Sequence, residues 1–170
     1  MDIKGYDHIL FVMTLCSVYR LAEWRRVLIL ITAFTIGHST TLVLATLKIV
    51  SVSNGLIEFL IPLTIFLTAL FNAVYRKEQV SRGLHLLKYS AALFFGLIHG
   101  LGFSNYLRSL LGKESSIVKP LFAFNLGIEV GQIIIVLAIM LITWLAVTVL
   151  HVKRREWNLL LAGAALGISL

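Results

Sequence analysis

The sequence predicts an all-helical bundle that spans a membrane. Hydrophobic residues make up 59% of the 170-residue chain and charged residues 14%, and the mean hydropathy is +0.94. A typical soluble domain is about 25% charged. Several apolar runs also reach the roughly 17–25 residues that a helix needs to cross hydrocarbon. We therefore expect one transmembrane domain over residues 1–170, with about six spans.

The expected helices follow the apolar runs in order. They cover 3–21, 27–47, 56–75, 84–107, 120–149 and a last segment from about 157. Charged connectors at 22–26 and 76–82 separate the first helix from the second and the third from the fourth, and a Ser/Asn/Gly turn lies at 51–55. Pro120 suits the first turn of the fifth helix. Pro62 lies inside the third helix, where it removes a backbone hydrogen-bond donor.

The Lys and Arg residues predict the orientation of these helices. Ten of the 15 lie around the connectors that join helices one and two, three and four, and five and six. Cytoplasmic loops carry the excess of Lys and Arg, so we expect those connectors inside and both termini outside. The net charge of +7 then belongs to the loops, and we expect no nucleic-acid partner. Cys16 is the single cysteine, which excludes an intrachain disulfide or a Cys-based metal site.

Five ionisable residues lie inside the expected helices at comparable depths, and Glu58 lies close to the outer end of the third helix. A charge at the bilayer centre costs at least about 2.5–3.5 kcal/mol, so such residues point to function. With a rise of 1.5 Å per residue, all five fall within a slab of the outer half roughly 10–15 Å deep. Mixed imidazole and carboxylate ligands suit Ni²⁺, Zn²⁺ and Co²⁺. The sequence therefore predicts a metal site formed by Asp7, His8, His38, His99 and Glu129.

Other polar and small residues would support this site. Asn125, Glu129 and Gln132 share one face of the fifth helix by their spacing. The supporting polar residues are Ser39, Glu58, Asn125 and Gln132. The small-residue pairs Gly96/Gly100 and Gly127/Gly131 are expected to bring helices four and five close together. For each residue alone, packing or a local hydrogen bond is the structural alternative.

Four spaced segments resemble the HupE/UreJ family of small bacterial membrane proteins. The segments are Gly5–Phe11, Thr32–Ser39, Phe95–Phe103 and Phe124–Gln132. The resemblance implies a nickel or cobalt permease of the bacterial inner membrane that serves hydrogenase or urease maturation. It also implies metal handling by two motifs, which survive here as Asp7-His8 and His99-Gly100.

Both motifs depart from the family pattern. Met1 stands at the upstream histidine position of the first motif, and Tyr106 stands at the glutamate position of the second. Glu129 on the next helix is a candidate replacement for that carboxylate.

The sequence is compatible with three functions. The first is a permease for a divalent transition metal, with nickel as the favoured candidate. The metal would bind in the outer half of the membrane. The second is a metal-dependent membrane hydrolase with an outward-facing site, in which Glu129 would act as general base on a metal-bound water. The third is a metal sensor or accessory subunit, for which the sequence gives no positive signal. A homo-oligomer is compatible with each.

Overall fold

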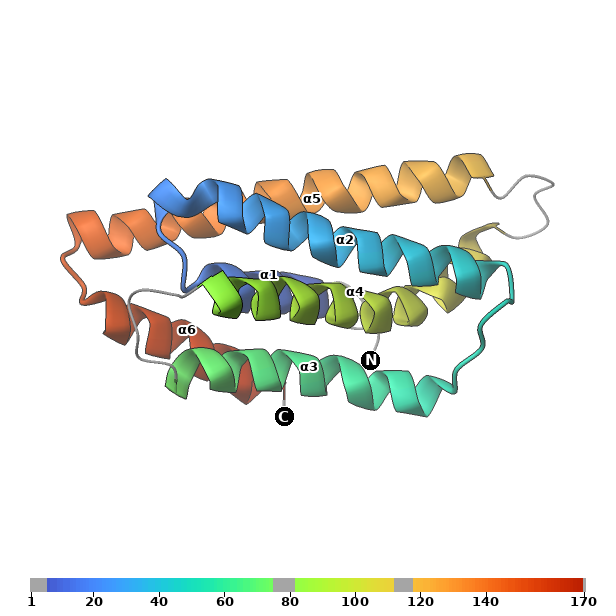
Figure 1. The fold of residues 1–170 in the computed structure, drawn as a ribbon, viewed down its shortest axis with the longest axis horizontal. Coiled ribbons are helices and arrows are strands. Elements are labelled where there is room, and N and C mark those ends of the chain that lie inside the picture. The colour runs from blue at the N-terminus through green and yellow to red at the C-terminus, as the bar shows by residue number, and fades with distance from the viewer. Residues whose placement is uncertain (1–5, 75–81, 112–117, 170) are drawn as a thin grey trace. The chain divides into compact units, whose positions relative to one another are not determined.

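The chain is all-helical in the parts that the structure describes. A computed structural model describes residues 6–74, 82–111 and 118–169. In these residues the α-helices are α1 (Tyr6–Cys16), α2 (Trp24–Thr46), α3 (Asn54–Val74), α4 (Arg82–Leu111), α5 (Val118–Trp144) and α6 (Arg154–Ile168) (Figure 1). A 3₁₀ turn, η1 (Leu21–Glu23), precedes α2, and a π-helix, η2 (Leu145–Val149), continues α5. The described residues contain no strand, so the predicted fold class is confirmed.

The first helix is shorter than the sequence indicated. We expected it over 3–21, but α1 ends at Cys16, and the start of the expected range lies outside the described residues. Hydroxyl groups near its end bond to backbone carbonyls: Thr14 Oγ1 donates to Leu10 O at 2.8 Å and Ser17 Oγ donates to Thr14 O at 2.9 Å. Such local bonds compete with helix continuation. The chain then turns before η1 and enters α2 at Trp24, three residues earlier than expected.

The remaining helix bounds lie within a few residues of the prediction. Helix α3 contains Pro62. Helix α4 runs to Leu111, beyond the expected end at 107, and η2 ends at Val149, where the fifth helix was expected to end. Leu150 N–H donates to Leu145 O at 2.9 Å, five residues back. That spacing widens the last turn compared with an α-helix.

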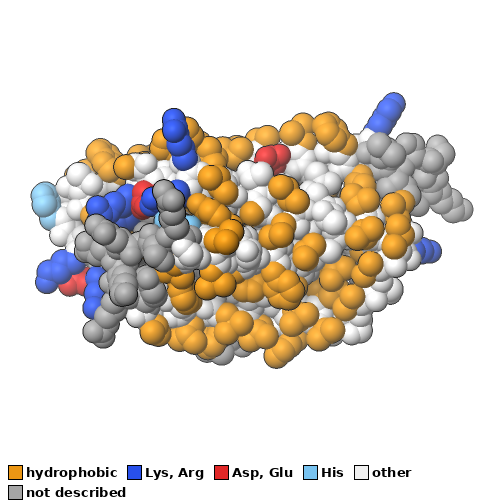
Figure 2. Space-filling view, viewed as in Figure 1, with side chains coloured by type: hydrophobic (Ala, Val, Ile, Leu, Met, Phe, Trp, Pro, Cys, Tyr) orange, Lys and Arg blue, Asp and Glu red, His pale blue; other side chains and the backbone are white. Residues whose placement is uncertain are grey.

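Four segments among the described residues are long and apolar enough to cross a membrane. They are Leu21–Thr46, Asn54–Val74, Gly83–Ser104 and Lys119–Val149. Helices α1 and α6 are shorter, at 11 and 15 residues. Large apolar side chains of α5 are exposed, among them Phe122, Ile134 and Leu137. Figure 2 shows hydrophobic side chains spread widely over the visible surface, which is the surface that lipid tails solvate.

Backbone packing divides the chain into two compact units. The first unit includes residues 6–28, 62–74 and 132–169, and the second includes 29–61, 82–111 and 118–131. The single transmembrane domain expected from the sequence stays a prediction.

In the first unit, polar side chains tie together segments that are distant in sequence. Helix α1 contacts α6. The side-chain amide of Asn72 in α3 donates to the carbonyl of Thr14 in α1. Trp157 Nε1 in α6 donates to Thr143 Oγ1 in α5 at 3.1 Å. These bonds satisfy polar groups that lipid could not, and they fix α1, α3, α5 and α6 within this unit.

Candidate functional site

Two buried histidines pack around one phenylalanine in the second unit. His38 on α2 and His99 on α4 both have 0% of their surface exposed. The His38 ring stacks on Phe34 with centroids 6.0 Å apart. The His99 ring meets the same phenylalanine edge-on, with centroids 5.3 Å apart and planes at 73°. Two imidazoles from different helices therefore contact the same buried phenylalanine ring.

Aromatic rings continue from this pair toward α5. Phe103 on α4 meets His38 edge-on at a centroid distance of 5.8 Å. Phe124 on α5 lies 5.8 Å from Phe103 between centroids. The imidazoles therefore have an apolar aromatic wall, which keeps their environment low in dielectric constant and strengthens any electrostatic contact made there.

Glycines on both helices set the spacing of α2 and α4. A Cβ at Gly96 would overlap the carbonyl oxygen of Phe34, and one at Gly100 would overlap the carbonyl oxygen of His38. From the other side, a Cβ at Gly37 would overlap the carbonyl oxygen of Leu93. The two backbones are thus in direct contact on either side of the histidines.

This contact corrects the predicted role of the glycine pairs. Gly96 and Gly100 were expected to draw α4 toward α5, but they pack against α2. At Gly127 and Gly131, no atom of the described residues lies within 4 Å of the position a Cβ would take, apart from the helix's own neighbouring backbone. The spacing of small residues marks a face that permits close approach, but it does not specify which helix approaches.

One hydroxyl group joins α2 and α4 beside the histidines. Thr41 Oγ1 lies 2.7 Å from the carbonyl oxygen of Leu97 on α4, against 3.2 and 3.3 Å from the carbonyls of Gly37 and His38 on its own helix. The interhelical contact is the shortest of the three. A polar contact between spans is worth about 0.6 kcal/mol on average, so this bond supplements the glycine packing.

A second polar bond joins α2 to α5. Ser39 Oγ donates to Asn125 Oδ1 at 2.9 Å, and Asn125 Nδ2 donates to Leu121 O one turn back at 3.0 Å. Two predicted supporting residues, Ser39 and Asn125, are therefore in contact. Glu129, one turn beyond Asn125 on α5, is half-buried.

The other predicted site residues are distributed differently. Asp7 and His8 are half-buried on α1 and Gln132 is buried on α5, all in the first unit. Glu58 is exposed near the start of α3. Among the residues that the structure describes, no group of three or more His, Cys, Asp or Glu is arranged to hold a metal ion. The five-residue metal site stays a prediction, and the side chain of Tyr106 and the whole of Met1 lie outside the described residues.

Three residues near the histidines or on the same helix were not among those predicted from the sequence. Phe34 and Thr41 lie four residues before and three after His38, a spacing that places all three on one side of α2. His85 at the start of α4 is buried, with 9% exposed, and stacks on Tyr89 at a centroid distance of 6.2 Å. It precedes His99 by 14 residues, close to four full turns. That spacing was the available signal, and it places both histidines on one side of α4.

The histidine pair has a specific chemical capacity. Neutral imidazole nitrogen is a ligand for Ni²⁺, Co²⁺, Zn²⁺ and Cu²⁺, and it binds only when it is not protonated. Two imidazoles leave room in the coordination sphere for water or for carboxylates. Such a partial set holds an ion less tightly than a closed structural site.

Length, composition and exposed apolar surface together define the class: this is a multi-pass helical membrane protein. A family model described as HupE / UreJ protein matches residues 2–170, and the chain belongs to that family. The resemblance found in the four segments is thereby confirmed. Neither a search of curated proteins nor a search of solved structures found a match.

Proposed function

We propose that this protein binds a divalent transition metal, with nickel as the favoured candidate, and carries it across the bacterial inner membrane. His38 and His99 would supply the imidazole ligands. The observation that carries the proposal is their complete burial on two helices whose backbones touch. A polar ring in a membrane interior is costly and marks an ion pathway or proton relay in many membrane proteins.

An incomplete ligand set suits transport better than storage. Permeation requires binding that is favourable enough to admit the ion and weak enough to release it. Two imidazoles with water completing the coordination sphere meet that condition. Asp7, His8 and Glu129 are proposed as further ligands that the ion would exchange during entry.

His85 is proposed as a second metal-binding residue on α4, the helix that carries His99. Fourteen residues of α-helix separate it from His99, a rise of about 21 Å. That distance is most of the roughly 30 Å hydrocarbon thickness. Two imidazole groups along α4 would provide successive weak binding sites, as multi-site conduction requires.

The test is uptake of radioactive nickel by proteoliposomes that contain the purified full chain. We expect time-dependent uptake by the unsubstituted protein. His38→Ala and His99→Ala should each lower it by at least about tenfold, because even indirect support of a metal ligand is worth about 10–100-fold. His151→Ala is the matched control, since His151 is exposed in the connector before α6.

Two results would contradict the proposal. One is metal bound in stoichiometric amount that never enters the vesicle lumen, which would favour the hydrolase alternative. The other is uptake by both histidine variants at the rate of the His151→Ala control.

A further inference from the structure

A cavity of about 220 Å³ lies in the first unit. Cys16 lines it from the end of α1, and Thr143 and Trp144 line it from α5. A cavity of roughly 150 Å³ in a protein interior holds benzene, so this one has room for a six-membered ring with substituents. The two α5 residues lie near the end of the segment Lys119–Val149, which is long and apolar enough to cross a membrane. A ligand dissolved in the bilayer is therefore the kind that would meet this cavity.

Two buried polar groups at the cavity have protons that the chain leaves unbonded. Cys16 is 2% exposed and is a free thiol. Thr143 is 9% exposed, and its Oγ1 accepts a hydrogen bond from Trp157 Nε1 at 3.1 Å. That bond uses the oxygen of the Thr143 hydroxyl group, and within the described part of the chain neither its proton nor the Cys16 thiol proton is bonded to an acceptor. A buried donor without an acceptor is costly, so an acceptor oxygen of a ligand would be favourable here.

The other lining residues indicate the chemistry of the ligand. Tyr19 and Thr148 also carry hydroxyl groups, and no Asp, Glu, Asn or Gln lines the cavity in the described part of the chain. Met140, Trp144 and Val147 add apolar and aromatic surface. Ligand pockets are mostly apolar, with a few polar groups that fix the orientation of the ligand. The ligand that suits this lining is apolar and carries acceptor oxygens.

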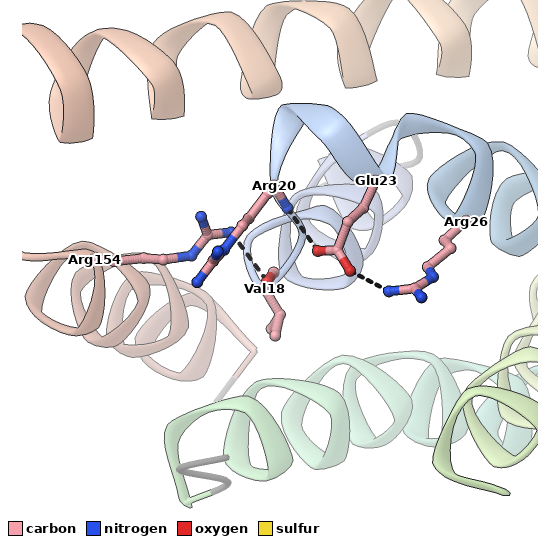
Figure 3. A network of polar contacts seen from close by, with 5 residues as sticks. All are labelled: Val18, Arg20, Glu23, Arg26 and Arg154. Atoms are coloured by element: carbon pink, nitrogen blue, oxygen red, sulfur yellow. Dashed lines mark hydrogen bonds and ion pairs between the residues drawn. The ribbon is translucent and has the colours of Figure 1, made fainter. Parts of the chain in front are cut away.

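The two arginines that line the cavity have bonds within the chain. Arg154 Nη2 donates to the carbonyl of Val18 at 3.2 Å (Figure 3). The backbone N–H of Arg20 donates to Glu23 Oε2 at 3.1 Å, and Glu23 also forms an ion pair with Arg26 (Figure 3). Both arginines make further contacts. We assign no ligand bond to either guanidinium group, so the ligand needs no negative charge.

We propose that this cavity binds an uncharged, membrane-soluble ring compound with carbonyl oxygens, of the quinone class. One carbonyl oxygen accepts from the Thr143 hydroxyl group, the other accepts from the Cys16 thiol, and the ring packs against Trp144. The two oxygens of a quinone lie on opposite sides of its ring, which suits donors that come from two helices, α1 and α5. Contact between the ring and an aromatic side chain is favourable as well. The lining residues belong to the first unit and the histidine pair to the second, so this site is separate from the proposed metal site.

The experiment measures thermal unfolding of the full chain in a maltoside detergent, which has no carbonyl group, during titration with duroquinone. Methyl groups occupy every ring carbon between its two carbonyls, which hinders covalent addition of the Cys16 thiol. Durene, which has the same ring and methyl groups but no oxygen, and methyl laurate, which has an ester carbonyl but no ring, are titrated separately. A ligand that binds only the folded state raises the Tm with its concentration, which yields an apparent Kd. We expect duroquinone to bind roughly fivefold or more tightly than durene, because only duroquinone accepts hydrogen bonds.

Four variants connect this effect to the cavity. Thr143→Val removes the hydroxyl group at nearly constant volume and should weaken duroquinone binding by about two- to tenfold, the range that one neutral hydrogen bond supports. It also breaks the bond to Trp157, so Trp157→Phe is the matched control: it breaks the same bond and leaves the Thr143 hydroxyl group at the cavity. Cys16→Ala removes the thiol donor, whereas Cys16→Ser keeps a donor at the same place. Binding should weaken in the first of these two and be retained in the second.

The expected pattern is weaker duroquinone binding by Thr143→Val and Cys16→Ala, with binding close to wild type by Trp157→Phe and Cys16→Ser. Equal protection by durene and duroquinone would overturn the proposal, because apolar contact alone would then explain the effect. Equal loss in Thr143→Val and Trp157→Phe would also overturn it, since the hydroxyl group would then act only through the fold. Protection by methyl laurate with the same dependence on Thr143 would refute the assignment to a quinone and identify the ester carbonyl of a lipid as the ligand.

Discussion

Gly100→Ala tests whether the contact of α2 and α4 holds the histidine pair. The added Cβ would overlap the carbonyl oxygen of His38 and the hydroxyl oxygen of Thr41, and the carbonyl carbon of His38 would lie at 2.9 Å. Backbone atoms cannot rotate away as a side chain can, so the helices must separate.

The contacts of the added Cβ determine how far Gly100→Ala lowers the free energy of unfolding. Overpacking of a well-packed interior costs about 1–3 kcal/mol. Weakening the contact of Thr41 with Leu97 adds about 0.6 kcal/mol, and replacing glycine by alanine in a helix returns about 0.8–1.0 kcal/mol. The net free energy of unfolding should fall by about 1–3 kcal/mol. For a chain of this size the Tm should then fall by about 2–12 °C.

Gly127→Ala is the matched control. It makes the same chemical change in a membrane helix, at a position where no other part of the described chain is near. Its Tm should stay level or rise, because only the helix-propensity gain remains. Thermal unfolding in detergent measures both variants. Equal Tm values for Gly100→Ala and Gly127→Ala would refute the account of the α2–α4 contact.

Further substitutions probe the polar contacts within each unit. Thr41→Val should lower stability by about 0.6 kcal/mol through loss of the contact with Leu97, and unchanged thermal unfolding would show that the glycines suffice. A double-mutant cycle of Ser39→Ala and Asn125→Ala should give a coupling energy of about 0.6–1.7 kcal/mol, whereas additive effects would argue against their bond. Trp157→Phe removes the indole N–H that Thr143 accepts and should cost about 0.5–1.5 kcal/mol in chemical unfolding; a null result there would contradict that bond.

Much of the fold could be predicted from the sequence because lipid imposes a simple rule. Every backbone polar group in the membrane must be bonded within the chain, so long apolar runs become helices. The bounds of α3 and α5 follow from this rule. The end of α1 does not, because the hydroxyl groups of Thr14 and Ser17 bond to nearby carbonyls, and such local bonds compete with the helix over a few residues.

The site was predictable only in part. His38 and His99 stand out because ionisable residues are rare in spans, and the structure buries both completely. Their common contact is harder to foresee, since Phe34 looks like any other core residue. The sequence also did not show that Gly96 and Gly100 would pack against α2. That helix contributes only Gly37 to the contact, and a single glycine forms no spacing motif.

For the proposed transport function, the backbone contact between α2 and α4 bears on how access to the histidines could alternate between the two sides of the membrane. With glycines at Gly37, Gly96 and Gly100, no long side chain lies between the two backbones to re-pack as one slides past the other. Close-packed interiors resist continuous deformation. These two helices should therefore move as one rigid body and carry His38 and His99 together. Other helices would then have to move to open and close access to the histidines.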